Sequence, residues 1–248
     1  MRPYAQKLQE MLSNIVSSSE GDVSMALAAQ RPVEKVMIIV VTSDRGLCGG
    51  YNSNLIKLAK SIIQEKYAAQ HAKGNVTILP IGKKGFENFT KNNFKVVSDY
   101  WDILGNLTFD KVQTAAKYAM EAFANKEVDA VELVYSEFKN AATQRFVSEQ
   151  FLPVAKVEGQ KNADFIFEPG KEILIAELMP KILNTQLFKA TLDGNASEHG
   201  ARMTAMDKAS DNANELLKTL KISYNRARQA AITTELTEIV SGAAALQG

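Results

Sequence analysis

The chain has 248 residues, of which 46% are hydrophobic and 23% are charged, which is enough for one large folded domain or two smaller ones. The formal net charge of +1 gives no reason to expect a nucleic-acid surface, and the single cysteine excludes an internal disulfide. The first residues contain no apolar signal region, and no apolar run is long enough to cross a bilayer. The composition therefore favours a cytoplasmic protein without a transmembrane segment of its own.

Residues 1–19 carry apolar side chains at helical spacing and end in a serine-rich and glycine-containing stretch. A helix that begins at residue 2 or 3, with no capping residue before it, has the pattern of a helix that was cut. We therefore expect residues 1–19 to be the remnant of a longer N-terminal coiled-coil helix.

Residues 33–157 alternate between strand and helix patterns. The run Val36–Val41 is apolar throughout, which is typical of a strand buried on both faces. The predicted strands are 36–41, 76–81, 128–138 and 145–153, and the predicted helices are 54–67, 86–91 and 109–125. A polar segment, 139–144, suits a hairpin turn between the last two strands. The alternation predicts an α/β domain with an open, mostly parallel, Rossmann-like sheet and an antiparallel edge.

Residues 171–246 favour a single long helix, which Pro180 is expected to break or kink. Beyond the proline, steps of four and three residues place apolar or small side chains on one stripe from Leu192 to Ser241. A repeat sustained over seven heptads predicts a coiled coil. Residues 181–246 would span roughly 100 Å, whereas the helix in residues 4–16 covers only about 20 Å. Either another protein covers most of the stripe, or a longer first helix does, or both do. The alternative is an ordinary amphipathic helix folded back on the α/β domain.

The glycine-rich segment 43–52 lies between a buried strand and a helix, where α/β folds bind phosphates. It contains neither the lysine of a Walker motif nor the dinucleotide-binding glycine pattern. We therefore predict that these glycines serve a tight turn and close packing, and that Cys48 is a buried structural thiol. Two histidines and one cysteine cannot form a clustered metal site. The sequence thus predicts no catalytic residue, metal or cofactor.

The segment Ile232–Ala245, with the sequence ITTELTEIVSGAAA, closely resembles the carboxyl-terminal signature of the gamma subunit family of ATP synthases. That signature reads Ile/Val-Thr-x-Glu-x-x-Asp/Glu-x-x-x-Gly-Ala, and every fixed position is met. Three further segments are similar to the same family: Ser43–Gly49, Ala196–Met203 and Tyr224–Ala230. The resemblance covers essentially the whole chain from Arg2, and it is to bacterial members in particular.

The resemblance implies the central rotating shaft of a proton-translocating ATP synthase. In this family the two terminal helices form an antiparallel coiled coil inside a hexamer of alpha and beta subunits. The α/β domain lies against the epsilon subunit and the membrane ring of c subunits. The shaft couples proton flow to ATP synthesis or hydrolysis on alpha and beta, so the implied protein is a non-catalytic peripheral subunit on the cytoplasmic face of the bacterial inner membrane.

The resemblance also implies functional positions. Arg228, Gln229, Thr233 and Glu235 match residues that contact beta-subunit loops near the top of the shaft. Arg202 matches a shaft arginine lower down and is likewise expected to contact the alpha and beta subunits. Phe165 and Glu168 match the foot near the membrane ring. Family members begin with a longer first helix, so we expect this sequence to be truncated or its start to be misplaced. The alternatives are a generic coiled-coil scaffold and a nucleotide-binding α/β enzyme that uses segment 43–52.

Overall fold

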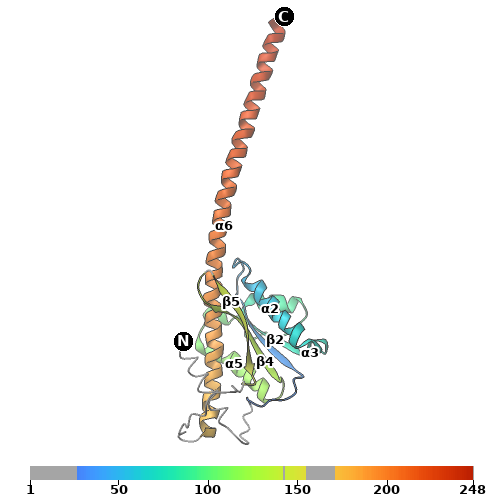
Figure 1. Cartoon of the computed structure of the whole chain (residues 1–248), viewed down its shortest axis with the longest axis vertical. Helices are drawn as coiled ribbons and strands as arrows, with labels where there is room; N and C mark the ends of the chain where they lie inside the picture. The colour runs from blue at the N-terminus through green and yellow to red at the C-terminus, as the bar shows by residue number, and fades with distance from the viewer. Residues whose placement is uncertain (1–26, 142, 155–170, 248) are drawn as a thin grey trace. The chain divides into compact units, whose positions relative to one another are not determined.

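The computed structural model describes residues 27–141, 143–154 and 171–247 (Figure 1). It divides into two compact units, Met1–Met203 and Thr204–Gly248. The remnant helix predicted in residues 1–19 and the foot residues Phe165 and Glu168 lie outside the described residues.

The first unit is built on a five-stranded sheet with the order β3-β2-β1-β4-β5. The strands are β1 (Val36–Val41), β2 (Val76–Ile81), β3 (Lys95–Val96), β4 (Ala130–Phe138) and β5 (Gln144–Leu152). Strands β1 to β4 run parallel to one another, and β5 pairs antiparallel with β4. The predicted open, mostly parallel sheet with an antiparallel edge is therefore confirmed.

Helices follow the strands as the hydrophobic pattern predicts. They are α2 (Tyr51–Lys66), α3 (Ala68–Ala72), α4 (Lys83–Lys91), the 3-10 helix η1 (Ile103–Asn106), α5 (Phe109–Ala124) and α6 (Lys171–Gln247). Thr108 caps α5, since its Oγ1 accepts a hydrogen bond from the Lys111 amide at 3.4 Å. The predicted helices 54–67, 86–91 and 109–125 are present, with boundaries shifted by up to three residues. The short elements α3, β3 and η1 were not predicted.

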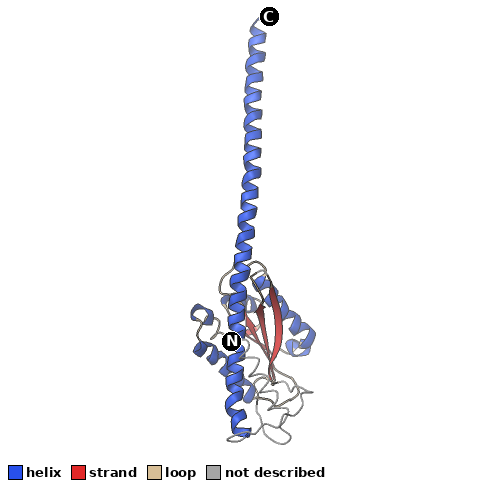
Figure 2. Ribbon diagram, turned by 60° about the vertical axis from the view of Figure 1, so that its left-hand side comes forward, coloured by secondary structure: helices blue, strands red, loops and turns tan. Residues whose placement is uncertain are grey.

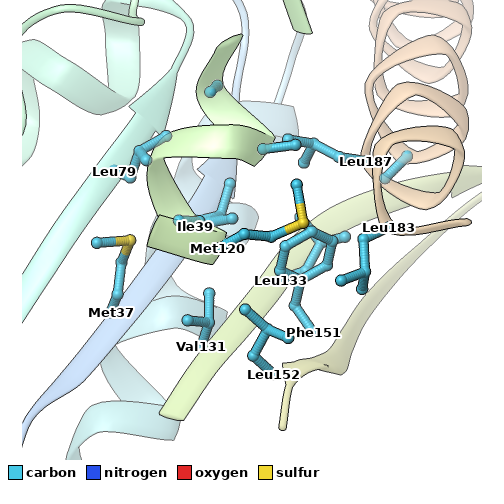
Figure 3. Packing of buried hydrophobic residues seen from close by; sticks show 14 of the residues in the cluster. Met37, Ile39, Leu79, Met120, Val131, Leu133, Phe151, Leu152, Leu183 and Leu187 are labelled. Carbon is cyan, nitrogen blue, oxygen red and sulfur yellow. The ribbon is translucent and has the colours of Figure 1, made fainter. Parts of the chain in front are cut away.

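Both faces of the sheet are buried, as the unbroken apolar sequence of β1 requires. Val36, Ile38 and Val40 pack with residues of α2 and α4 on one face. The alternate residues of β1 pack with α5 and with the first part of α6 on the other face. Figure 2 shows the strands with helices on either side. In Figure 3, Leu183 and Leu187 of α6 lie in the same cluster as Leu133 and Phe151 of the sheet.

Pro180 does not interrupt α6. Of the predicted break or kink, the break is therefore wrong, and the kink stays a prediction. Proline inside a helix costs about 3 kcal/mol, but the helix is held here by residues buried in the core on both sides of it. Met179, Ile182 and Leu183 are each at most 3% exposed, and burial of such a side chain contributes about 1.5–3 kcal/mol. The predicted alternative of a helix folded onto the α/β domain therefore describes this first part of α6.

The second unit consists of the remainder of α6 from Thr204. Its 44 helical residues span roughly 65 Å. Every residue from 206 to 246 is exposed, including the apolar residues of the predicted stripe. Among these, Leu217 is 51% exposed, Leu220 56% and Tyr224 68%. The stripe is thus uncovered in this part of the chain.

Candidate functional site

The loop between β1 and α2 is closed on itself by side-chain hydrogen bonds. The Ser43 amide donates to Asn52 Oδ1 at 3.0 Å, and the Asn52 amide group donates to Ser43 Oγ at 2.7 Å and to Cys48 Sγ at 3.2 Å. Gly49 adopts φ +58°, a conformation that glycine reaches without strain. Cys48 is 2% exposed. The predictions of a tight packed turn and a buried structural thiol are therefore confirmed.

The carboxyl edge of the sheet at β1 is where doubly wound folds bind ligands, because the strand order reverses there. In this chain α6 fills that position. A Cβ on Gly194 would lie 2.9 Å from Val41 Cγ1 and 3.4 Å from the Tyr51 hydroxyl. The Tyr51 hydroxyl donates to the Gly194 carbonyl at 2.8 Å, and Ser197 Oγ donates to the Ser136 carbonyl at 3.2 Å. The helix is therefore in direct contact with the ends of two central strands.

Tyr51 acts as a hydrogen-bond donor at this edge. Burial raises the pKa of its hydroxyl well above the ordinary range, and the nearby charge of Glu198 raises it further. The hydroxyl therefore remains protonated at physiological pH and keeps its bond to the helix backbone.

Arg202 lies one helical turn beyond Glu198 and connects α6 to the loop. Its guanidinium donates to the Gly46 carbonyl and to Glu198 Oε1. The Arg202 and Glu198 side chains are 18% and 11% exposed. The family resemblance implies that Arg202 contacts neighbouring subunits; the structure shows it engaged within its own chain, and the subunit contact stays a prediction.

The four predicted tip residues lie in the second unit, and all are exposed. Arg228 and Glu235 are seven residues apart, so they share one helix face, and Gln229 and Thr233 share another. Thr233 Oγ1 donates to the Gln229 carbonyl at 2.9 Å, and their predicted contacts with beta-subunit loops stay predictions.

Sequence reasoning missed the contacts that α6 makes with the sheet edge. The sequence pattern does not single out Tyr51, Ser136, Ser197 or Glu198. One signal was available: small residues recur at steps of four and three along α6, namely Ala190, Gly194, Ser197 and Ala201. Such a row of small side chains allows close approach of a helix backbone.

A basic groove of about 490 Å³ lies between α2 and α4. Four lysines contribute to its lining: Lys57, Lys60, Lys84 and Lys91. Lys84 donates to Glu87 at 2.7 Å, and this hydrogen bond lowers the pKa of Glu87. The amides at the start of α4 are already bound, because Lys83 donates to Asp44 Oδ1 and Lys84 to the Ser43 carbonyl. The groove therefore offers ammonium groups to an anion but no helix-terminal amides for a phosphate.

Within the described ranges, no group of three or more histidine, cysteine or acidic side chains is placed to hold a metal ion. The described helices also include none with the length and apolarity needed to span a membrane.

Comparison with known proteins identifies the family. A family model described as ATP synthase matches residues 1–246. The ATP synthase gamma chain of Cytophaga hutchinsonii is 48% identical over 252 residues, covering 99% of this chain and 85% of the relative. The gamma chain of Flavobacterium johnsoniae is 49% identical over 251 residues, covering 100% of this chain and 86% of the relative.

Solved structures share the fold. A chain of the mitochondrial ATP synthase of Euglena gracilis, in an assembly of OSCP, F1 and c-ring, superposes with a TM-score of 0.63 at 20% identity, covering 99% of this chain and 90% of that one. A chain from the central stalk and c-ring of the Tetrahymena thermophila enzyme gives 0.55 at 21% identity, covering 83% of this chain and 94% of that one. The family model matches residues 1–246, and the two gamma chains are 48% and 49% identical over nearly the whole of this chain. The chain therefore belongs to the ATP synthase gamma chain family.

Proposed function

We propose that this chain is the central rotating shaft of a proton-translocating ATP synthase, coupling proton flow through a membrane ring to ATP turnover on a surrounding hexamer of alpha and beta subunits. The observation that carries the proposal is the second unit of α6. It exposes an apolar stripe through residues 206–246, and a stripe of this length requires covering partners. Because the chain belongs to the gamma chain family, the proposed partners are the alpha and beta subunits.

The surface chemistry of this helix suits a shaft that turns. Four basic residues form a collar with which acidic loops of the hexamer can pair: Lys218, Lys221, Arg226 and Arg228. Beyond the collar, residues 239–246 are small or apolar. A surface of this kind turns inside a close-fitting sleeve without breaking strong ion pairs. The charged residues are not distributed evenly around the helix axis. Each rotation step of the shaft would therefore present a different surface to each catalytic subunit.

The chain itself is proposed to be non-catalytic, with nucleotides bound on alpha and beta. Support comes from the sheet edge where a doubly wound fold would bind a nucleotide, since Gly194 of α6 packs there against Val41 and Tyr51. The loop at that edge also has no lysine to reach a phosphate.

The α/β body and the foot are proposed to face the epsilon subunit and the ring of c subunits, with Phe165 and Glu168 nearest the ring. The chain is accordingly proposed to be a peripheral protein on the cytoplasmic face of the bacterial inner membrane. A generic coiled-coil scaffold would share the apolar stripe, but it would not need the fixed Thr-x-Glu-x-x-Glu-x-x-x-Gly-Ala tip.

Reconstitution tests the proposal. Alpha and beta subunits are assembled with and without this chain, and steady-state ATP hydrolysis is measured. We expect hydrolysis to depend on the chain and the isolated chain to hydrolyse no ATP. Equal hydrolysis with and without the chain contradicts the shaft function, and hydrolysis by the isolated chain supports the enzyme alternative instead.

A further inference from the structure

The first part of α6 is attached to the α/β body by two kinds of contact. Apolar residues between Met179 and Ala190 pack on the sheet. This packing selects the face of α6 that meets the sheet, but apolar contacts impose no bond direction. Hydrogen bonds have preferred distances and directions. Gln186 donates one long hydrogen bond to Glu149 Oε2 of β5 at 3.5 Å, and three further hydrogen bonds with the body lie between Gly194 and Arg202.

These polar contacts reach three separate parts of the body. Tyr51 at the start of α2 donates to the Gly194 carbonyl. Ser197 donates to the Ser136 carbonyl near the end of β4. Arg202 donates to the Gly46 carbonyl in the loop after β1 and to Glu198 on its own helix. We refer to the side chains of Tyr51, Ser197, Glu198 and Arg202, with their carbonyl acceptors, as the edge clamp.

Part of the edge clamp is removed from water, whereas the hydrogen bond from Arg202 to the Gly46 carbonyl is exposed. Tyr51 is 2% exposed and Ser197 is 0% exposed. Glu198 has a buried carboxylate whose charge is balanced by Arg202, and removal of one partner from such a pair leaves an uncompensated charge. The planar guanidinium offers several donors in a fixed fork, which lets one side chain hold Glu198 and Gly46 at the same time.

The clamp also lies at a defined place on the helix. Arg202 is the next-to-last residue of the first unit. The wholly exposed segment of α6 begins four residues further along, at residue 206.

We propose that the edge clamp fixes the rotational position of α6 on the α/β body and carries the turning force between them, with Arg202 as the central positioning residue. This inference rests on the proposed shaft function. It gives Arg202 a role inside the chain, distinct from a contact with a neighbouring subunit.

The test uses the complete membrane-bound complex with three variants of this chain. Arg202→Met removes both hydrogen bonds but keeps an apolar stem, and Arg202→Lys keeps the charge without the fork. Arg145→Met is the matched control, because it breaks another Arg–Glu pair of the same unit, with Glu137, which is more exposed and does not touch the loop. Two quantities are measured: amide hydrogen exchange in residues 44–50, and the ratio of ATP-driven proton pumping to ATP hydrolysis.

For Arg202→Met we expect exchange in residues 44–50 to rise roughly tenfold, as a loss of about 1.4 kcal/mol implies, and the pumping ratio to fall. Arg202→Lys should give intermediate values, and Arg145→Met should match the unmodified complex. Unchanged exchange overturns the clamp itself. Raised exchange with an unchanged pumping ratio overturns its role in carrying force.

Two further measurements keep the test decisive. If Arg202→Met does not assemble, Ser197→Ala removes one clamp hydrogen bond with a smaller perturbation. Amide exchange is then measured in residues 134–138, around the Ser136 carbonyl, together with the same pumping ratio, and the same outcomes apply. A complex that hydrolyses ATP and pumps protons equally well without this chain refutes the shaft function. A complex that requires the chain but is insensitive to Arg202→Met refutes only the clamp.

Discussion

At the scale of single residues, Asp129 is the most heavily bonded carboxylate among the described residues. Its Oδ1 accepts from Arg31 Nε at 2.7 Å, and its Oδ2 accepts from the Glu34 and Lys35 amides at 3.1 and 2.9 Å. Arg31 also lies over the ring of Phe123, 4.4 Å from its centroid. These contacts bind the segment before β1 to the turn between α5 and β4.

The ionisation of Asp129 should make stability depend on pH. Burial alone would raise its pKa, but the amides of Lys35 and Glu34 and the Arg31 guanidinium outweigh burial and lower the pKa below its ordinary value of 3.8. Because the pKa is lower in the folded state, the ionised Asp129 carboxylate contributes its full stabilisation above pH 3.8. This contribution is lost as the pH falls through the folded-state pKa.

We therefore predict that Asp129→Asn lowers the free energy of unfolding of the α/β body by about 1–3 kcal/mol near neutral pH. Denaturant titrations at several pH values should show the difference from the unmodified chain shrinking below pH 3.8. Glu87→Gln, which alters an exposed pair with Lys84, should leave stability unchanged near neutral pH. A constant difference down to the most acid pH would contradict the assignment.

At the scale of elements, α6 approaches the sheet closely because glycine stands at position 194. In Gly194→Ala the new methyl group would be 2.9 Å from Val41 Cγ1, and Val41 is a fully buried residue of a central strand. Overpacking of this kind costs about 1–3 kcal/mol, whereas alanine gains about 1 kcal/mol over glycine in helix propensity.

The predicted net effect of Gly194→Ala is a loss of stability of up to about 2 kcal/mol, measured as the free energy of unfolding of the first unit. Gly242→Ala is the matched control, since nothing lies within 4 Å of its added Cβ, and it should not lower stability. The packing argument fails if both substitutions have the same effect.

An element can be predicted from the sequence when its apolar residues follow the period of a single helix or strand. Strand β1 and helix α5 were predicted closely because their apolar residues match the period of one element. Helix α6 was predicted at 171–246 and lies at Lys171–Gln247, but the packing of its first part on the sheet was not predicted, because two stripes overlap in it. Leu192 and Ala196 continue the predicted coiled-coil stripe, whereas Gly194 and Ser197 face the sheet, and neither of these two is apolar.

Contacts to backbone carbonyls are harder still to predict. The acceptors of Arg202 and Ser197 are the carbonyls of Gly46 and Ser136, and a carbonyl is present at every residue. Glu132 is a similar case: it interrupts an apolar strand, yet it is 4% exposed and accepts from Tyr67 and Lys66. Only the fold brings such partners together.

At the scale of the whole molecule, the exposed tip should matter in the complex and not in the isolated chain. Glu235 is exposed, so Glu235→Ala should leave the unfolding of the chain unchanged. In the reconstituted complex we predict a roughly tenfold loss of ATP hydrolysis if its contact contributes about 1.4 kcal/mol to the rate-limiting barrier.

Glu215→Ala provides the comparison, because it removes an exposed acidic residue of the same helix that lies off the apolar stripe. Hydrolysis with Glu215→Ala should equal that of the unmodified complex. Equal losses for the two variants would remove the reason to assign Glu235 a specific contact.

The uncovered helix from residue 206 onward has a consequence for the life of the subunit in the cell. A helix with no buried side chain opens at little cost in free energy, and open backbone is what proteases cleave. A copy without partners would lose this segment while its α/β body survived, and assembly would protect it. Surplus copies would therefore be degraded from the end that performs the coupling, which keeps unassembled shafts from accumulating.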